Sequence, residues 1–178
     1  MTKTITSAEF GCDLNEFLQK YKYQPTLTAK LDNVEMTRFT QTLVNEIVLW
    51  KIDRFVQLTD ELLAEIENVK TLSHGKHRDA EFLIHSLLKI RGVDLAMAST
   101  ILRFRNPTVF QIIDRHAYRA VYGSKLPLYS TSPPMKKIGV YFDYLDELIR
   151  LCATRNLEFG TVDRILYQFD KDTNGKLD

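Results

Sequence analysis

The sequence has little glycine, proline or cysteine and almost no net charge. Its 178 residues include 7 Gly, 5 Pro and 2 Cys, and the formal net charge is +1. Because chain-breaking residues are scarce and helical periodicity extends over long stretches, we predict an all-α or nearly all-α fold. Hydrophobic residues make up 44% of the chain, which is enough for a substantial core. The length suits one compact helical domain over residues 1–178, or two small lobes that share a core.

Metal-ligand and disulfide patterns are missing from the sequence. Cys12 and Cys152 are not spaced like metal ligands and do not form a disulfide framework. Such sparse cysteine fits a reducing, cytoplasmic compartment. His74 and His77 lie in an expected loop without a third ligand at a useful spacing, so we interpret them as solvated. No basic start leads into an apolar run, and no stretch of about 18 apolar residues could span a membrane. We therefore expect a cytoplasmic monomer with no metal or other cofactor and no membrane partner.

Apolar residues at three- and four-residue steps define the expected helices. Thr59 and Ser7 are the expected N-caps of two of them, and Pro134 suits the first turn of the longest. A polar segment broken at Pro25 and a buried connector over Val109–Ile113 separate helical stretches. The expected helices cover residues 7–20, 36–51, 59–69, 78–89, 95–105, 115–122, 134–154 and 160–169.

Positive charge is concentrated in one part of the nearly neutral chain. The segment from Lys89 to Lys125 holds seven basic and two acidic residues, a local charge of +5. Such a segment can bind phosphate without making the whole protein adhere to nucleic acid. The alternative interpretation is a solvated helix face with no ligand.

Residues 78–105 have the pattern of two helices joined by a tight hairpin. Gly92 can adopt the positive φ that a side chain would resist, Val93 would fill the space between the helices, and Ala98 would let them approach closely. Backbone N–H groups at the start of the second helix could then bind a phosphate oxygen, with Lys89 and Arg91 adding charge. The pattern is carried by Leu87, Ile90, Gly92, Val93, Ala98, Ile101 and Leu102.

Asp94 stands where such hairpins usually have a second glycine. Its side chain could cap the second helix, but it also brings negative charge close to the expected phosphate. An ordinary αα-hairpin without a ligand therefore remains an alternative for this segment.

Two short motifs resemble the helix-hairpin-helix DNA glycosylases, and the bacterial and archaeal 8-oxoguanine glycosylases in particular. They are Ala98-Ser99-x-x-Leu102-Arg103 and Ile113-Asp114-Arg115-His116-x-x-Arg119, and Asp163-Arg164-x-Leu166-Tyr167-x-Phe169 is similar more loosely. The resemblance covers about 35 residues firmly. It implies two helical lobes flanking a cleft, with damaged duplex DNA as the partner.

The resemblance makes Asp114, in the segment 106–122, the catalytic carboxylate. Breaking a glycosidic bond builds positive charge on the deoxyribose, which a carboxylate in a dry pocket stabilises while it orients or activates the nucleophile. The alternative is that Asp114 only caps the helix that follows it. The expected DNA-binding residues are Lys89, Arg91, Gly92, Val93, Asp94 and Arg115.

The lysine with which bifunctional members of that family attack the sugar has no counterpart here. Ala96 occupies the matching position, and no lysine stands between Lys89 and Asp114. The four-cysteine iron–sulfur motif of some members is also missing. We therefore expect a monofunctional glycosylase that uses water to hydrolyse the N-glycosidic bond of a damaged purine. The alternatives are a non-catalytic hairpin module that binds DNA and an all-α protein-interaction domain.

The last residues of the chain resemble the first half of a calcium-binding EF-hand loop. Oxygen-bearing side chains alternate from Asp170, and Gly175 takes the sixth position of the pattern. The sequence stops before the twelfth position, where a bidentate Glu is required. We therefore interpret residues 170–178 as a polar tail.

Overall fold

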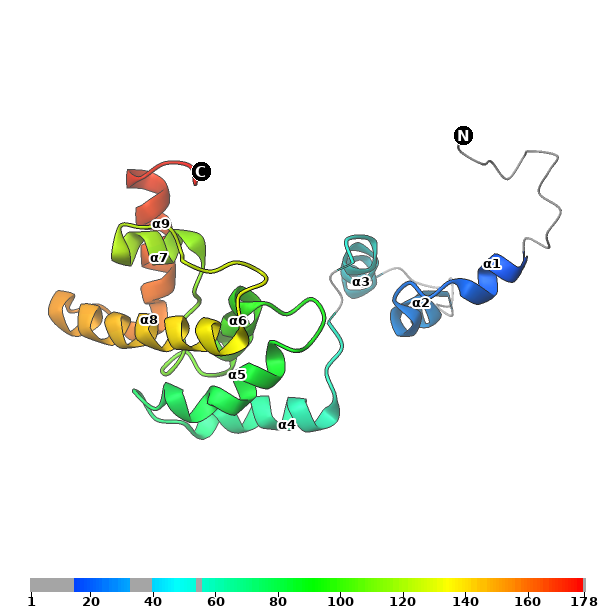
Figure 1. Ribbon diagram of the computed structural model, residues 1–178, viewed down its shortest axis with the longest axis horizontal. Helices are drawn as coiled ribbons and strands as arrows, with labels where there is room; N and C mark the ends of the chain where they lie inside the picture. Colours follow the sequence, from blue (N-terminus) through cyan, green and yellow to red (C-terminus); the bar gives the residue numbers. More distant parts are fainter. Residues whose placement is uncertain (1–14, 33–39, 54–55, 178) are drawn as a thin grey trace. The chain divides into compact units, whose positions relative to one another are not determined.

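The computed structural model describes residues 15–32, 40–53 and 56–177, and all regular secondary structure in these ranges is helical (Figure 1). The prediction of an all-α fold is therefore confirmed for the described residues. The chain divides into two compact units, Met1–Phe55 and Val56–Asp178. The hairpin segment and Asp114 both belong to the second unit, and a single domain over residues 1–178 stays a prediction.

The first unit contains α1 (Asn15–Lys20), α2 (Pro25–Asp32) and α3 (Gln41–Lys51). Helix α2 was not expected, because Pro25 was interpreted as a break. Pro25 instead begins the helix, where its fixed φ is suitable and its missing N–H would have had no helical partner. The indole N–H of Trp50 donates to Thr28 Oγ1 at 2.9 Å and holds α2 against α3. The first part of the helix expected over residues 7–20, with its Ser7 cap, lies outside the described residues.

The second unit is built around the long helix α8, which contacts α5, α6 and two short 3₁₀ turns. Thr59 caps α4 as expected, accepting a hydrogen bond from Leu62 N at 3.3 Å. The bounds predicted for α6 and α7 are those observed. The elements are α4 (Asp60–Asn68), η1 (Val69–Thr71), η2 (His77–Ala80), α5 (Glu81–Leu87), α6 (Leu95–Arg105), α7 (Arg115–Tyr122), α8 (Pro134–Arg155), η3 (Phe159–Thr161) and α9 (Val162–Thr173).

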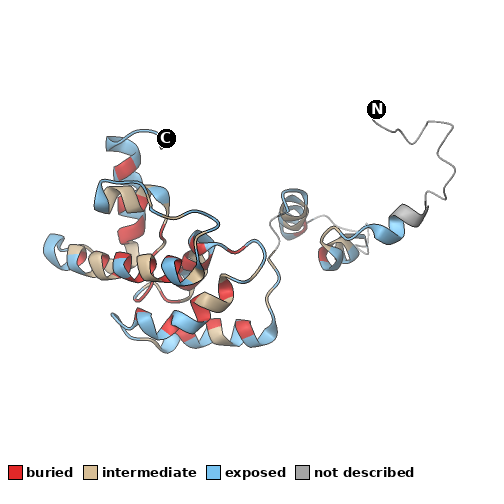
Figure 2. Cartoon of the chain, viewed as in Figure 1, coloured by how far each residue is buried: buried red, intermediate tan, exposed pale blue. Residues whose placement is uncertain are grey.

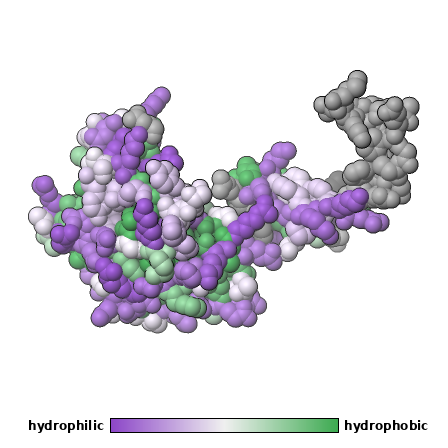
Figure 3. All heavy atoms as spheres, in the orientation of Figure 1, coloured by the Kyte–Doolittle hydropathy of each residue, from purple (hydrophilic) through white to green (hydrophobic). Residues whose placement is uncertain are grey.

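The core of the second unit lies where α5, α6 and α8 meet. Figure 2 shows buried residues along the inner faces of these helices, and Leu87, Ala98, Leu102 and Leu145 have no exposed surface. A side chain larger than that of the fully buried Ala98 would overpack this core, while the close approach of the two hairpin helices that Ala98 was expected to allow stays a prediction. On the face seen in Figure 3, hydrophilic side chains cover most of the second unit and hydrophobic ones form separate patches. Within the described ranges, no helix has both the length and the apolar character needed to cross a bilayer.

Helices α7 and α9 pack side by side and are joined by a buried carboxylate (Figure 1). Asp170 accepts hydrogen bonds from Arg119 Nε at 2.9 Å, His116 Nδ1 at 2.7 Å and Asn174 Nδ2 at 2.9 Å. The hydrogen bonds from Arg119 are the main reason that the pKa of Asp170 lies well below its ordinary value. Both carboxylate oxygens are thus engaged inside the protein rather than offered to a cation at the start of an EF-hand loop.

His77 differs from the prediction of a solvated loop, because it is buried in η2. Its ring packs against Phe142, and its Nε2 lies 3.3 Å from Asp146 Oδ1 without a well-aligned hydrogen bond. Burial disfavours the charged imidazolium and lowers the pKa of His77, although Asp146 acts in the opposite direction. The neutral ring is therefore the form that the folded protein favours.

We expect the free energy of unfolding to fall as the pH decreases from 7 to 5.5. A depressed pKa in the folded state means that the unfolded chain takes up the His77 proton first, below a pH of about 6.5. A His77→Leu variant should lose most of this pH dependence, measured by urea unfolding at both pH values. A His85→Leu control removes another histidine, and its free energy of unfolding should still fall between pH 7 and pH 5.5. Equal pH dependence in wild type and His77→Leu would contradict this assignment.

Candidate functional site

The turn between α5 and α6 has the geometry that its glycine was expected to provide. Gly92 has φ +86°, and Val93 N donates to Ile90 O at 3.0 Å to close the turn. Val93 is buried and belongs to the hydrophobic core of the second unit, while Lys89 and Arg91 are exposed at the surface of the turn. The turn therefore presents basic side chains and backbone on the outside and an apolar anchor on the inside.

Asp94, the residue that departs from the hairpin pattern, is neutralised by a lysine from another helix. Its Oδ1 accepts from Leu95 N at 2.7 Å, which caps α6, and from Lys137 Nζ at 2.7 Å. Lys137 is buried on α8 and also donates to Ser130 O at 2.8 Å. The negative charge expected near the hairpin is thus paired, and the same lysine fixes the loop before α8.

The sequence reasoning missed Lys137. A signal was present, because Lys137 stands four residues before Tyr141 and shares the inward face of the helix expected over 134–154. A lysine on an apolar helix face needs a buried partner, and Asp94 was the unexplained acid in the hairpin.

The connector between α6 and α7 is buried, as predicted, and three side chains hold its backbone. Ser99 Oγ accepts from Ile113 N at 3.2 Å. Tyr141 and Tyr144 of α8 donate through their hydroxyls to the carbonyls of Gln111 at 2.9 Å and Ile112 at 3.1 Å. Burial raises the pKa of both tyrosines well above the ordinary value, so they remain donors. The chain leading to position 114 is therefore fixed from two helices.

Asp114 immediately precedes α7 as its N-cap and is half-buried. Its Oδ1 accepts from Ala117 N at 2.8 Å, so its expected role as an N-cap is confirmed. Within residues 56–177, no hydrogen bond engages Asp114 Oδ2, and this oxygen remains accessible to a ligand or to water. One carboxylate can thus hold a helix with one oxygen and act on a bound molecule with the other.

Asp114 and the start of α6 line the same open cavity, of about 490 Å³. Asp94 and Ala96 contribute from the hairpin, Asp114 and Arg115 from α7, and Lys137 from α8. Of the expected site residues, the structure therefore brings together Asp94, Asp114 and Arg115. Lys89, Arg91, Gly92 and Val93 stay on the turn and are not part of the cavity wall. A smaller cavity of about 310 Å³ also includes Asp114, together with Ile112, Asp163, Arg164, Tyr167 and Gln168.

The basic segment is not a uniform positive face. Arg103, Arg105 and Arg119 are within 4 Å of carboxylates from outside the segment, which balance their charge. The other four basic residues of the segment are exposed. The acidic partners are Asp163, Glu67 and Asp170, and the exposed basic residues are Lys89, Arg91, Arg115 and Lys125.

No metal centre is formed by the residues that the structure describes, in which no group of three or more His, Cys, Asp or Glu side chains converges. Cys152 is a free, buried thiol whose pKa is raised by desolvation. No protein-family model, curated protein or solved structure matches this chain. Its function must therefore be inferred from the sequence motifs and the geometry of the Asp114 cavity.

Proposed function

We propose that this protein is a monofunctional DNA glycosylase of the helix-hairpin-helix type that excises a damaged purine, oxidised guanine being the first candidate. The observation that carries the proposal is the cavity in which Asp114 of α7 and the first residues of α6 form one wall. A volume of about 490 Å³ lies within the range of pockets that enclose small ligands, and it suits an extruded nucleoside. In this proposal two helical lobes flank the cavity and the hairpin binds the duplex.

Asp114 would act through the oxygen that does not cap α7. As the N-glycosidic bond breaks, the purine leaves with the bonding electron pair and the deoxyribose becomes positively charged. The free Asp114 Oδ2 would stabilise that charge and accept a proton from the water that attacks the sugar. Because Oδ1 is fixed by Ala117 N and the connector backbone is held by α6 and α8, the carboxylate is positioned before substrate binds.

Water is the proposed nucleophile because the cavity offers no lysine that is prepared for attack. Ala96 lines the wall where bifunctional relatives of this type have their lysine. Lys137 also lines the cavity, but its ammonium donates to Asp94 and to Ser130 O. Through these hydrogen bonds, Lys137 of α8 connects the hairpin to the loop before α8.

Duplex oligonucleotides that each carry one damaged purine test the proposal. We expect at least one lesion to give strand breaks only after alkali treatment, because excision leaves an abasic site and no lyase step follows. The control is Asp114→Asn protein on the same duplexes. Absence of alkali-labile sites above that control across the panel would refute the glycosylase proposal, and breaks without alkali would refute its monofunctional form.

A non-catalytic DNA-binding module is the second candidate. It is favoured by the capping bond from Ala117 N to Asp114, which gives the carboxylate a structural role that needs no substrate. Such a module would bind duplex DNA with a steep salt dependence and leave every lesion intact. A protein-interaction domain, in contrast, would show no salt-dependent DNA binding.

A further inference from the structure

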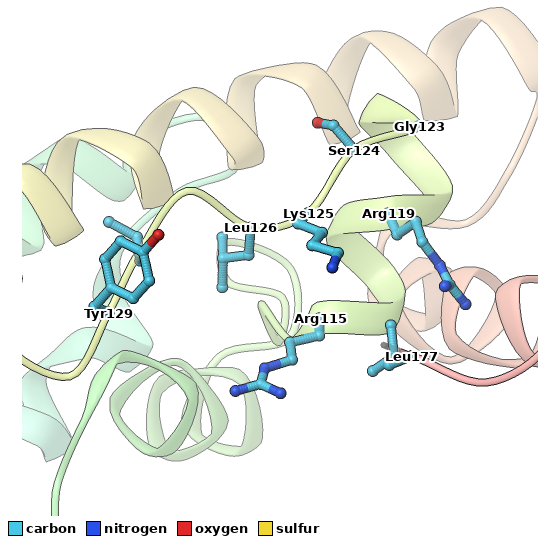
Figure 4. A pocket seen from close by; sticks show the side chains of 9 residues that line it. Arg115, Arg119, Gly123, Ser124, Lys125, Leu126, Tyr129 and Leu177 are labelled. Carbon is cyan, nitrogen blue, oxygen red and sulfur yellow. The ribbon is translucent and has the colours of Figure 1, made fainter.

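A second cavity, which is basic, adjoins the Asp114 cavity. Of its lining residues only Arg115 was expected to bind DNA, and the proposed excision chemistry uses none of them. Its volume is about 520 Å³, and it lies between α7, the loop that follows α7, and the end of the chain (Figure 4). Three of its lining side chains are basic and none is acidic. The lining residues are Arg115, Arg119, Gly123, Ser124, Lys125, Leu126, Leu128, Tyr129 and Leu177.

Arg119 lines this cavity, and hydrogen bonds fix the position of its side chain. Its guanidinium is held by Asp170, and it also donates to Gly175 O at 2.9 Å and Lys176 O at 3.2 Å. These bonds fasten the end of the chain to α7 and place Leu177 in the lining. Because the Asp170 carboxylate balances the charge of Arg119, the basic character available to a ligand comes from the other two cations.

Those two cations, Arg115 and Lys125, are exposed and lie on the same cavity. Among the ion pairs of the described residues, neither has a carboxylate partner. Arg115 is also the first residue of α7, where the positive end of the helix dipole disfavours a cation. Its position is therefore unfavourable for the stability of α7, while its donor-rich side chain lines the cavity, where it can bind an anion.

Tyr129 supplies an aromatic face beside the cations. It is 78% exposed, so its ring is accessible to a ligand. The turn that carries it is held by two hydrogen bonds of 3.0 Å with Ser132 and by the bond from Lys137 to Ser130 O. A ring on a fixed turn can stack on a nucleobase at little cost in conformational entropy.

We propose that this cavity binds a phosphate carried by a nucleotide, with Arg115 and Lys125 on the phosphate and Tyr129 against its base. Four residues (Arg115, Leu126, Leu128 and Tyr129) line both this cavity and the Asp114 cavity, so the two are neighbours. The ligand is a nucleotide unit of the DNA strand next to the extruded one, or a free mononucleotide with the same phosphate chemistry. The first identity rests on the proposed function, because only a DNA-binding protein would bring a strand there.

The test is fluorescence anisotropy of the full chain with a labelled ten-nucleotide single strand, competed by dAMP and by inorganic phosphate. Arg115→Gln and Lys125→Gln should each weaken binding several-fold and reduce the slope of log affinity against log salt by about one. Tyr129→Ala should weaken binding about five-fold or more and leave that slope unchanged. Matched controls are Arg155→Gln, Lys76→Gln and Phe82→Ala, which change exposed residues that do not line the cavity.

The competitors separate the two sources of the phosphate. Competition by dAMP that disappears in Arg115→Gln supports a free nucleotide, and binding of the strand alone supports a strand phosphate. Variants that bind like their controls would overturn the proposed site even if lesions are excised. Variant-sensitive strand binding by a protein that excises nothing would keep the site and refute the glycosylase proposal. Thermal unfolding of each variant checks that the fold is intact.

Discussion

Asp114→Asn is expected to reduce base excision by about 10²-fold or more while leaving the fold intact. The substitution removes the negative charge that would stabilise the developing positive charge on the sugar, and losses of this size follow removal of one such electrostatic group. Asparagine is as good an N-cap as aspartate, so its amide oxygen can still accept from Ala117 N. Single-turnover excision and urea unfolding of the same preparation measure the two effects separately.

Asp114→Ala provides the matched comparison, because it removes the cap as well as the charge. We expect it to lose excision to the same extent and, in addition, to lower the free energy of unfolding by about 1 kcal/mol. If Asp114→Asn excised as fast as wild type, the carboxylate would be a helix cap and nothing more. If Asp114→Ala unfolded at the same urea concentration as wild type, the capping role assigned to Asp114 would be wrong.

Asp170→Asn should be the most destabilising conservative substitution among the acidic residues of the second unit. The change removes a fully buried charge that accepts from Arg119, His116 and Asn174, and leaves Arg119 without its counter-ion. Breaking a buried pair in this way costs about 3 kcal/mol or more. The folded-state pKa of Asp170 is lowered, so its stabilising effect is present above a pH of about 4 and is lost as the pH falls further.

The control for this prediction is Asp172→Asn, two residues along the same helix. Asp172 is exposed, and among the residues described it accepts only from Gln168 Nε2 at 2.8 Å, so we expect a change within about 0.5 kcal/mol. Urea unfolding at pH 7 and pH 3 measures both variants. A difference between wild type and Asp170→Asn that persisted undiminished at pH 3 would contradict the role assigned to the charged carboxylate.

Local signals were sufficient for the elements around the site. The periodicity of 95–105 and 115–122 predicted α6 and α7 correctly, because each begins at an aspartate cap and has a clear stop. Gly123, in the left-handed conformation that glycine readily adopts, ends α7. Asp114 and the first residues of α6 line one cavity, and the catalytic role that the resemblance implies for Asp114 stays a prediction.

What the sequence could not provide depends on contacts between distant residues. Pairing of Lys137 with Asp94 spans 43 positions, and pairing of Arg119 with Asp170 spans 51. Neither pair has a short-range signature, yet each decides how much charge reaches the surface. His77 was misjudged for the same reason, because its burial depends on Phe142 and the rest of α8 rather than on the polar residues beside it.

The bridge between Asp94 and Lys137 makes two positions of the sequence interdependent. In a homologous chain with glycine at position 94, a lysine at 137 would be buried without its counter-ion, which is costly. Chains that restore the second hairpin glycine should therefore replace this lysine with an uncharged residue. Covariation of these two columns in an alignment would identify the proteins that fasten the loop before α8 in the same way.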